Sequence, residues 1–386
     1  MLKAIPKVIL IFLLTAIMGC GTQAPSPPLS GTLEIINGFY VMHLHGTPQE
    51  MGRAHGALLK SQISSLIQDY IINGILKEYG VPFSMVAIMA RRYEAGIPAE
   101  CRTEMQALAE GAGVSYDEVL VGNLIVDLAD VVLSLAPMGS SGFVAGGAAT
   151  SGEAVVHGAN IEWKDYNNAL QKNLVIIYYE PDQGNKFVSL SYAGGIGVLI
   201  GMNKHLSASI SVVNAGVSTE AIPTTLNLRR LLQSSNNLAD ASANLIADNR
   251  TRGYNVPLAG SQEGFFITEL SPMHYKLRQP AATWEALVGT NHFVSEAMQP
   301  YQLATADANS VHRYDRLIDL IAQNYGLIDG SLAKTFMSDR NDPYGDYINS
   351  DSVVYSAVLL PEESAFWVAK GPVGNVADYV RFNLED

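Results

Sequence analysis

The chain has 386 residues, of which 48% are hydrophobic and 16% are charged, and its formal net charge is −13 at pH 7. This length and apolar content allow one large domain or two modest ones around a packed core. The acidic excess argues against nucleic acid or an anionic lipid surface as a partner. Only two cysteines are present, Cys20 and Cys101, and Cys101 has no partner if Cys20 is lipidated, so we expect no disulfide framework.

The first residues have the pattern of a secretory signal. Lys3 and Lys7 precede an apolar run, too short for a resident membrane-spanning helix, that leads to "IMGC". "IMGC" resembles a lipobox, so we expect residues 1–19 to be removed and Cys20 to carry lipid; a plain signal peptide with a chance cysteine is the alternative. Residues 20–31, rich in proline and serine, then tether the globule to the membrane. The pattern predicts an exported, lipid-anchored protein of the bacterial cell envelope, at the outer membrane or on the periplasmic or extracellular face.

Residues 46–132 carry mainly helical signals. Thr47, Pro48 and Glu50 predict a helix start with a capping box, and apolar residues then recur at helical spacing. A second helix is expected to open at Pro98, and a third follows further along the chain. We therefore expect residues 32–139 to form a helical N-terminal segment.

The later two helices of this segment have their own boundary signals. The one that opens at Pro98 is predicted to stop at Gly111. The next is predicted to start at Ser115, with Glu118 closing a second capping box.

Past Ser140 the pattern changes to a period of two. Strands are expected at "FVAGGAAT", "EAVVHGANIEW", "KNLVIIYYE", "KFVSLSYA" and "LSASISVVNA". A helical block, more strands at "GFFITEL" and "TWEALVGTN", a helix over residues 309–325 and three closing strands follow. Two groups of strands with helices between them predict two sheets faced by helices, so residues 140–386 are expected to form one compact α+β catalytic body.

Several catalytic patterns fail on this sequence. Phe143 stands where a nucleophile elbow needs its second glycine, and the Ser-x-x-Lys match at Ser331 and Lys334 lacks its companion motifs. No acidic or histidine partner set follows at ligand spacing, so we expect no metal site and structural roles for the candidate histidines. These are His43, His45 and His55.

The stretch "MGSSGF" suggests a different nucleophile. A serine hydroxyl needs a base beside it, and one solution is the residue's own α-amino group. That group, with a pKa of about 7.7 to 8.0, exists only if the chain is cut directly before the nucleophile. Gly139 before Ser140 offers an unhindered carbonyl and a backbone that tolerates strain. The change from helical to strand patterns at this point favours autocleavage between Gly139 and Ser140, although an ordinary surface turn is the alternative.

The run from Gly139 to Trp163 resembles the signature of N-terminal nucleophile (Ntn) hydrolases of the isopenicillin N acyltransferase type. These enzymes are related to penicillin V acylase, the choloylglycine hydrolases and the acid ceramidase group. Four further motifs in the same order carry the resemblance over most of residues 40–386: "GTPQEMGRAHG", "AEGAGVSYDEVLVGN", "GTNHFVS" and "HRYDRL". The resemblance implies a four-layer αββα sandwich preceded by a helical pro-segment, and no metal or organic cofactor.

The resemblance also implies roles for individual residues. Ser140 takes the place of the nucleophile and new N-terminus, and Asn291 that of the side chain that donates to the oxyanion. Asn214 lies near a second oxyanion donor, which in this family is largely a backbone N–H. Arg313 matches an arginine that organises the site, and Glu162 matches an aspartate that orients the new amine. Such roles fit a developing oxyanion that needs fixed donors. Taken singly, the two asparagines could satisfy backbone groups, and Glu162 and Arg313 could form a structural ion pair.

Three positions depart from the family pattern. Ser140 replaces a cysteine, which lowers intrinsic nucleophilicity, and Glu162 replaces an aspartate, which changes the reach of the carboxylate. Ala159 stands where many relatives have arginine. We expect a self-processing hydrolase or acyltransferase for linear N-acyl amides, whose two chains stay associated. A lipoprotein that only binds N-acyl compounds and a phospholipase-B-like lipid deacylase are the alternatives.

Overall fold

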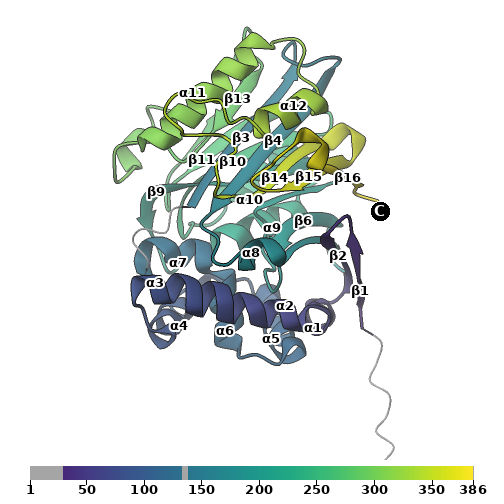
Figure 1. The fold of residues 1–386 in the computed structure, drawn as a ribbon, viewed down its shortest axis with the longest axis vertical. Helices are drawn as coiled ribbons and strands as arrows, with labels where there is room; N and C mark the ends of the chain where they lie inside the picture. Colours follow the sequence, from purple (N-terminus) through teal and green to yellow (C-terminus); the bar gives the residue numbers. More distant parts are fainter. Residues whose placement is uncertain (1–28, 133–137, 386) are drawn as a thin grey trace, which may run out of the picture.

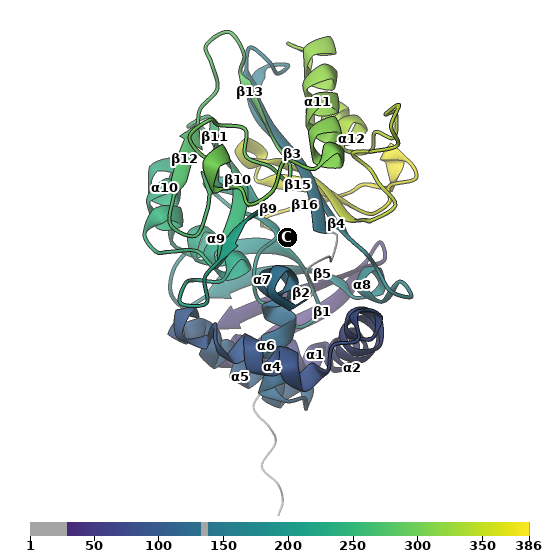
Figure 2. The same ribbon diagram turned by 90° about the vertical axis from the view of Figure 1, so that its left-hand side faces the viewer.

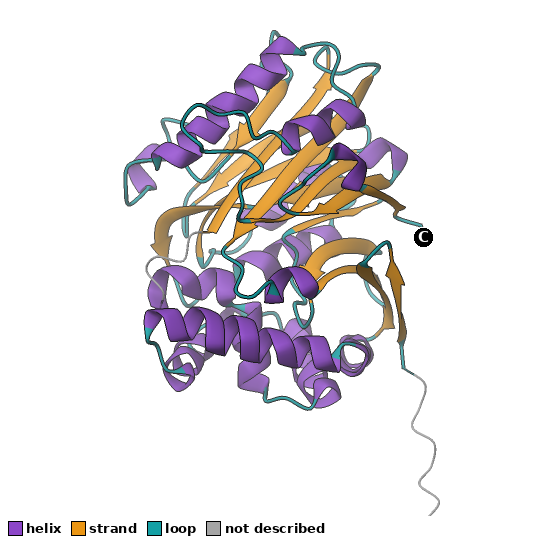
Figure 3. Cartoon of the chain, in the orientation of Figure 1, coloured by secondary structure: helices purple, strands orange, loops and turns teal. Residues whose placement is uncertain are grey.

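The computed structural model describes residues 29–132 and 138–385. Two sheets face each other and carry helices on both outer faces (Figure 1). A further group of helices closes one end of this sandwich (Figure 3). The predicted α+β fold with αββα layers is thus confirmed. The expected signal peptide and Cys20, where lipidation is expected, lie outside the described residues.

The larger sheet has ten strands. They are β1 (Gly31–Ile36), β2 (Phe39–Gly46), β5 (Leu174–Pro181), β6 (Phe187–Tyr192), β7 (Ile200–Asn203), β8 (Leu206–Ser209), β9 (Ser211–Val217), β10 (Arg252–Gly260), β11 (Phe265–Leu270) and β12 (Tyr275–Arg278). Their order is β1-β2-β5-β6-β7-β8-β10-β11-β12, and β9 also pairs with β10. Among the described strands of this sheet, β2 and β5 are the one parallel pair. The run predicted as one strand over residues 206–215 is divided between β8 and β9 at Ile210.

The smaller sheet has six strands, all antiparallel to their neighbours. They are β3 (Met138–Gly147), β4 (Glu153–Trp163), β13 (Ala286–Gly289), β14 (Val353–Leu360), β15 (Ala365–Lys370) and β16 (Val380–Asn383), in the order β13-β3-β4-β14-β15-β16. β3 begins before the predicted strand and includes Gly139 and Ser140, which pair with Glu162 and Ile161 of β4. The Gly-Ser-Ser-Gly stretch is therefore part of a strand and not a surface turn.

Helices cover the outer faces of the two sheets on opposite sides of the molecule (Figure 2). α11 (Ala308–Gln323) and α12 (Gly330–Met337) pack on the smaller sheet, and α9 (Thr224–Ser234) and α10 (Leu238–Ile246) pack on the larger one. The remaining helical elements are α1 (Pro48–Leu58), α2 (Lys60–Ser65), the π-helix η1 (Leu66–Leu76), α3 (Lys77–Tyr79), α4 (Phe83–Arg91), η2 (Glu94–Gly96), α5 (Ala99–Ala112), α6 (Tyr116–Asn123), α7 (Ile125–Val132), α8 (Ala169–Lys172), η3 (Gln299–Tyr301), η4 (Pro361–Glu363) and η5 (Val376–Asp378). No helix in the described ranges is long and apolar enough to span a bilayer.

The predicted helix starts are correct, but one predicted stop is wrong. Both capping boxes form, at Thr47 with Glu50 and at Ser115 with Glu118. α5 continues past Gly111 and ends at Gly113, whose φ of 69° is the left-handed conformation of a C-cap. Gly111 serves helix packing instead: a Cβ there would lie 2.4 Å from the carbonyl oxygen of Arg53 in α1.

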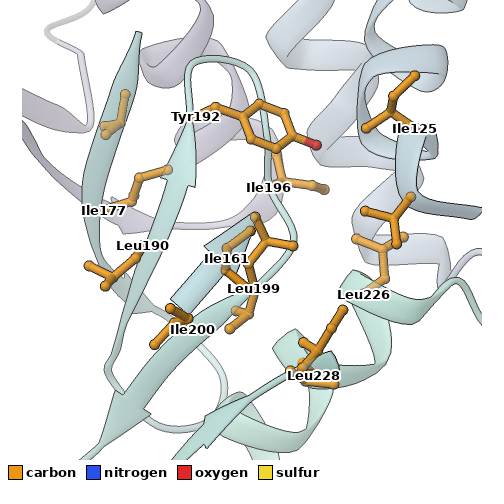
Figure 4. Packing of buried hydrophobic residues seen from close by; sticks show 14 of the residues in the cluster. Ile125, Ile161, Ile177, Leu190, Tyr192, Ile196, Leu199, Ile200, Leu226 and Leu228 are labelled. Carbon is orange, nitrogen blue, oxygen red and sulfur yellow. The ribbon is translucent and has the colours of Figure 1, made fainter. Parts of the chain in front are cut away.

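The N-terminal segment is firmly joined to the rest of the molecule. Besides its helices it supplies β1 and β2 to the larger sheet, so this segment is not purely helical. Arg229 of α9 donates to both carboxylate oxygens of Glu104 in α5, at 2.9 and 2.6 Å, and both side chains are buried. One hydrophobic core cluster, part of which is shown in Figure 4, draws residues from both sides of Ser140.

Candidate active site

Ser140 makes two hydrogen bonds with one asparagine, Asn291. Its backbone N–H donates to Oδ1 of Asn291 at 2.9 Å, and Nδ2 of Asn291 donates to its Oγ at 3.2 Å. Ser140 is only 3% exposed. A single side chain therefore contacts both the nitrogen and the hydroxyl of the candidate nucleophile.

Neighbouring groups fix the orientation of the Asn291 amide. Its Nδ2 also donates to the carbonyl oxygen of Val212 in β9 at 2.9 Å, and its backbone N–H donates to Oγ of Ser310 at 2.8 Å. Arg313 donates to Oδ1 at 2.9 Å. Because a guanidinium has no acceptor, Oδ1 must face Arg313, and the NH₂ group must then face Ser140 Oγ.

Arg313, in α11, connects four groups around Ser140. Its Nη1 donates to the carbonyl oxygen of Ser140 at 2.6 Å, to Oγ of Ser141 at 2.7 Å and to Oε1 of Glu162 at 3.2 Å, while Nη2 reaches Asn291. The residue is 2% exposed. The planar, multiply donating guanidinium is suited to hold such groups in one geometry.

The carboxylate of Glu162 lies against the residue that precedes Ser140. A Cβ on Gly139 would be 2.5 Å from Oε2 of Glu162, so a larger residue there would displace this carboxylate. Burial raises the pKa of Glu162, and the nearby Arg313 opposes that shift. In the continuous chain the nitrogen of Ser140 bonds to Asn291, and Glu162 binds Arg313 and Ser141.

A second layer of contacts holds Arg313 from its other side. Its Nε donates to Oδ1 of Asn309 at 2.9 Å, and Nδ2 of Asn309 donates to Oδ1 of Asp346 at 2.7 Å. Asp346 also pairs with Nδ1 of His312 at 2.6 Å, and the hydrogen bond from Asn309 contributes most to lowering the pKa of Asp346. Sequence reasoning missed Asn309 and Asp346; the i, i+4 spacing of Asn309 and Arg313 on one helix was the available signal for the first.

Asn214 does not join this group. It is exposed on β9, and its backbone carbonyl accepts from the N–H of Leu303 at 2.9 Å. Among the described residues its side chain makes no hydrogen bond to Ser140 or Asn291. The β9 residue that reaches the site is Val212, two positions earlier and through its backbone.

Two of the three candidate histidines make contacts within the fold. His43 stacks on Tyr178 with ring centroids 4.7 Å apart. Nε2 of His55 accepts from the N–H of Gly194 at 2.9 Å, and burial lowers the pKa of His55 to about 3. His45 is exposed.

A small cavity of about 240 Å³ opens beside Ser140, and we call it the Ser140 hollow. It is lined by Val126, Met138, Gly139, Ser140, Ile161, Glu162, Trp163, Leu199, Ile210 and Val212. The hydroxyl of Ser140 has a fixed amide donor, but within residues 29–132 and 138–385 no imidazole or carboxylate hydrogen-bonds to it. The arrangement can stabilise an oxyanion, but among the described residues no proton acceptor is placed against the hydroxyl of Ser140.

The αββα layers and a serine on an inner strand, held by asparagine and arginine, define the class of Ntn hydrolases and acyltransferases. Residues 159–368 match the acyl-coenzyme A:6-aminopenicillanic acid acyl-transferase family. The chain belongs to this family, whose members act on amides, and the resemblance inferred from the sequence motifs is confirmed.

Individual relatives are more distant. The chain is 27% identical to an uncharacterized protein of Archaeoglobus fulgidus, over 83% of this chain and 61% of that protein. It is 24% identical to protein dcd1A of Dictyostelium discoideum, over 58% of this chain and 57% of that protein. The chain thus spans about three fifths of the length of these curated relatives.

Solved structures that resemble the chain have low identity to it. The Caenorhabditis elegans ortholog of N-acylethanolamine-hydrolyzing acid amidase is 16% identical with a TM-score of 0.43, and the match covers 62% of this chain and 96% of that one. Penicillin V acylase from Agrobacterium tumefaciens is 11% identical with a TM-score of 0.43, covering 64% and 86%.

Proposed function

We propose that the protein is a self-processing N-terminal nucleophile enzyme that cleaves or transfers the acyl group of linear N-acyl amides. The observation that carries this proposal is the double contact of Asn291 with the nitrogen and the hydroxyl of Ser140. That geometry serves a residue whose nitrogen and oxygen both take part in the reaction. The missing proton acceptor is then the α-amino group of Ser140 itself.

The first reaction is the cut between Gly139 and Ser140. Oγ of Ser140 attacks the carbonyl carbon of Gly139; the Oγ–C bond forms, the C–N bond breaks, and the hydroxyl proton moves to the nitrogen. Water then hydrolyses the ester, which leaves a carboxylate on Gly139 and a free hydroxyl and amine on Ser140. The chains 20–139 and 140–386 stay associated through the shared sheet and the buried Glu104–Arg229 pair.

Turnover uses the same atoms on an external amide. Oγ of Ser140 attacks the acyl carbon while the α-amine, with a pKa near neutrality, accepts its proton. Nδ2 of Asn291 donates to the oxyanion, the amine of the substrate leaves with a proton, and water or a second amine takes the acyl group from Ser140. Arg313 and Glu162 hold the reacting strand in place. No metal or organic cofactor is required by this scheme.

The proposal includes the location of the enzyme. The signal-like residues 1–19, the lipobox-like "IMGC" and the tether over residues 20–31 support a lipid-anchored protein of the bacterial envelope. Substrates would then be N-acyl amides that reach the outside of the inner membrane.

The test is turnover of N-acyl p-nitroanilides by the purified protein, with mass analysis of the 140–386 fragment for an acyl group on Ser140. We expect release of p-nitroaniline, and a drop in kcat of about 10²- to 10³-fold in Asn291→Ala because an oxyanion donor is lost. Asn341→Ala, at an exposed position of a surface loop, is the matched control and should match the parent. A processed protein that gains no acyl group on Ser140 and hydrolyses no substrate would overturn the proposed enzymatic function. It would favour a lipoprotein that only binds N-acyl compounds.

A further inference from the structure

Asn291 lies on a loop that leaves the smaller sheet and crosses to the larger one; we call residues 290–303 the Asn291 loop. It follows β13 directly, and at its far end the backbone N–H of Leu303 donates to the carbonyl oxygen of Asn214 in β9 at 2.9 Å. Apart from the short η3, the loop has no helix or strand. Loops place side chains less precisely than helices and strands do, so groups outside the loop must hold its backbone.

Asn255 in β10 contacts the backbone on both sides of Asn291. Its Nδ2 donates to the carbonyl oxygen of Thr290 and to that of His292, each at 2.9 Å. The side chain is fully buried. The amide cannot be turned over, because Oδ1 would then face two carbonyl oxygens. Since the two bonds lie on either side of Asn291, they fix where the backbone of Asn291 lies.

Glu269 in β11 holds the next part of the loop. It lies directly opposite Asn255 in the pairing of β10 with β11, so both side chains are on the same face of the sheet. Oε1 of Glu269 accepts from the backbone N–H of Val294 at 2.8 Å, and the carboxylate also accepts from the N–H and the hydroxyl of Ser295. The carboxylate is buried, and Nη1 of Arg278 lies 3.4 Å from Oε1. Hydrogen bonds to a charged acceptor are the stronger ones.

This polar pair is not what stability alone would select. Oδ1 of Asn255 is buried, and in the part of the chain that the structure describes it has no hydrogen-bond partner. An unpaired buried acceptor destabilises the fold, and so does a carboxylate taken out of water. Departures from an apolar core are concentrated at functional sites. The position of this pair, beneath the loop that carries Asn291, points to such a role.

We propose that Asn255 and Glu269 are positioning residues: they hold the Asn291 loop where the amide of Asn291 reaches both the nitrogen and the hydroxyl of Ser140. Within the described ranges neither side chain hydrogen-bonds to Ser140, so their effect passes through Asn291. The consequence for turnover rests on the proposed function, in which Asn291 donates to the oxyanion. A displacement of about 1 Å near a reacting centre is enough to lower a rate about 100-fold.

Asn255→Asp tests this with little change in shape, because a carboxylate cannot donate to the two carbonyl oxygens. The matched control is Asn203→Asp in β7. Asn203 is also fully buried, and its Nδ2 donates to the carbonyl oxygens of Leu232 and Ser235 at 2.7 and 3.0 Å. Both variants lose two bonds of the same kind, so urea unfolding should show similar losses of stability. Asn255→Ser and Asn203→Ser are the second matched pair if the buried aspartates do not fold.

The kinetic readout is turnover of N-acyl p-nitroanilides, with kcat referred to the processed chain. In Asn255→Asp, kcat should fall about 10- to 100-fold while KM stays within about twofold of the parent, and Asn203→Asp should match the parent. Glu269→Gln keeps one acceptor oxygen and should show the same split with a smaller fall.

A double variant distinguishes positioning from a structural role. In the Asn291→Ala background, Asn255→Asp should lower kcat by less than about twofold, because the amide through which it acts is already gone. The full fall in that background, or an equal fall in Asn203→Asp, would overturn the inference.

Hydrogen exchange measured by mass spectrometry separates this inference from the proposed function. In the uncut Ser140→Ala chain, Asn255→Asp should speed exchange at least about tenfold in peptides that cover residues 290–295, and Asn203→Asp should not. Faster exchange there in a protein that never turns over would refute the enzyme and keep the positioning of the loop. Unchanged exchange in a protein that does turn over would keep the enzyme and refute the inference.

Discussion

Arg313 is the residue on which the geometry around Ser140 depends. One guanidinium contacts the backbone of Ser140, the hydroxyl of Ser141, the carboxylate of Glu162 and the amide of Asn291. Charge-assisted hydrogen bonds of this kind are stronger than neutral ones and are directional. Because Asn291 takes its orientation from this contact, the oxyanion donor that we propose depends on Arg313.

Replacing Arg313 by lysine keeps the charge and removes the planar fork. A single ammonium on a flexible stem cannot serve both the Asn291 side and the Ser140 side, so we expect Arg313→Lys to slow self-processing and turnover by about 100-fold or more. The matched control is Arg316→Lys, since Arg316 on the same helix pairs with Asp339 away from the site. Processing rates follow from gel densitometry, and parent-like rates in Arg313→Lys would contradict the assigned role.

The sequence motifs identified most of the residues around Ser140, but not Asn309 and Asp346, which hold Arg313 in place. Ser140, Glu162, Asn291 and Arg313 are separated by up to 173 residues, and the structure brings them together. The side chain of Asn214 is not in the group, and the β9 residue that contacts Asn291 is Val212, through its backbone carbonyl. Asp346 comes from a loop, and no local pattern predicts which helix a loop residue will contact.

Among the elements, β4 and β8 are joined across the two sheets by a buried histidine. Nδ1 and Nε2 of His157 hydrogen-bond to the hydroxyls of Ser207 and Ser209, at 2.9 and 2.8 Å. Burial lowers the pKa of His157 to about 3, so the ring stays neutral in the folded protein at mildly acidic pH. In the unfolded chain the same ring takes up a proton below about pH 6.5.

This difference makes stability depend on pH with a definite sign. The folded-state pKa is depressed, so the contribution of His157 is complete above about pH 6.5 and is lost as the pH falls toward 3. Between pH 7 and pH 5 we expect this residue to cost about 2 kcal/mol of unfolding free energy. Urea unfolding at both pH values measures it.

His157→Asn should lower stability at pH 7 and reduce the loss between pH 7 and pH 5 by that amount. The control is His45→Asn, at an exposed position, which should keep the pH dependence of the parent. An unchanged pH dependence in His157→Asn would show that the buried ring does not set it.

The elements that the sequence did not predict have identifiable causes. β10 is a fully buried strand, yet it contains Gly253, Pro257 and Gly260. Proline and glycine in a sequence argue against a central strand, so this strand was not predicted. β2 pairs in parallel with β5, about 130 residues later, and no local signal reports such a partner. Capping boxes, in contrast, are local, and Thr47 and Ser115 were predicted correctly.

At the scale of the whole molecule, the chain behaves as two interlocked parts that meet at Ser140. The segment before it supplies two strands of the larger sheet and one side of the Glu104–Arg229 pair. The part after it supplies Ser140, the proposed nucleophile, and the groups that contact it. A cut at Gly139–Ser140 would therefore free an amine without separating the parts, since the interface between them is sheet and core.

The central claim is that Ser140 becomes a new N-terminus. The most direct measurement is the intact mass of the purified mature protein, with terminal sequencing, for the parent and for Ser140→Ala. The account predicts two associated fragments in the parent, the second beginning at Ser140, and one uncut chain in Ser140→Ala. A single uncut chain in the parent would contradict it, because Ser140 would then lack the amine that serves as its base.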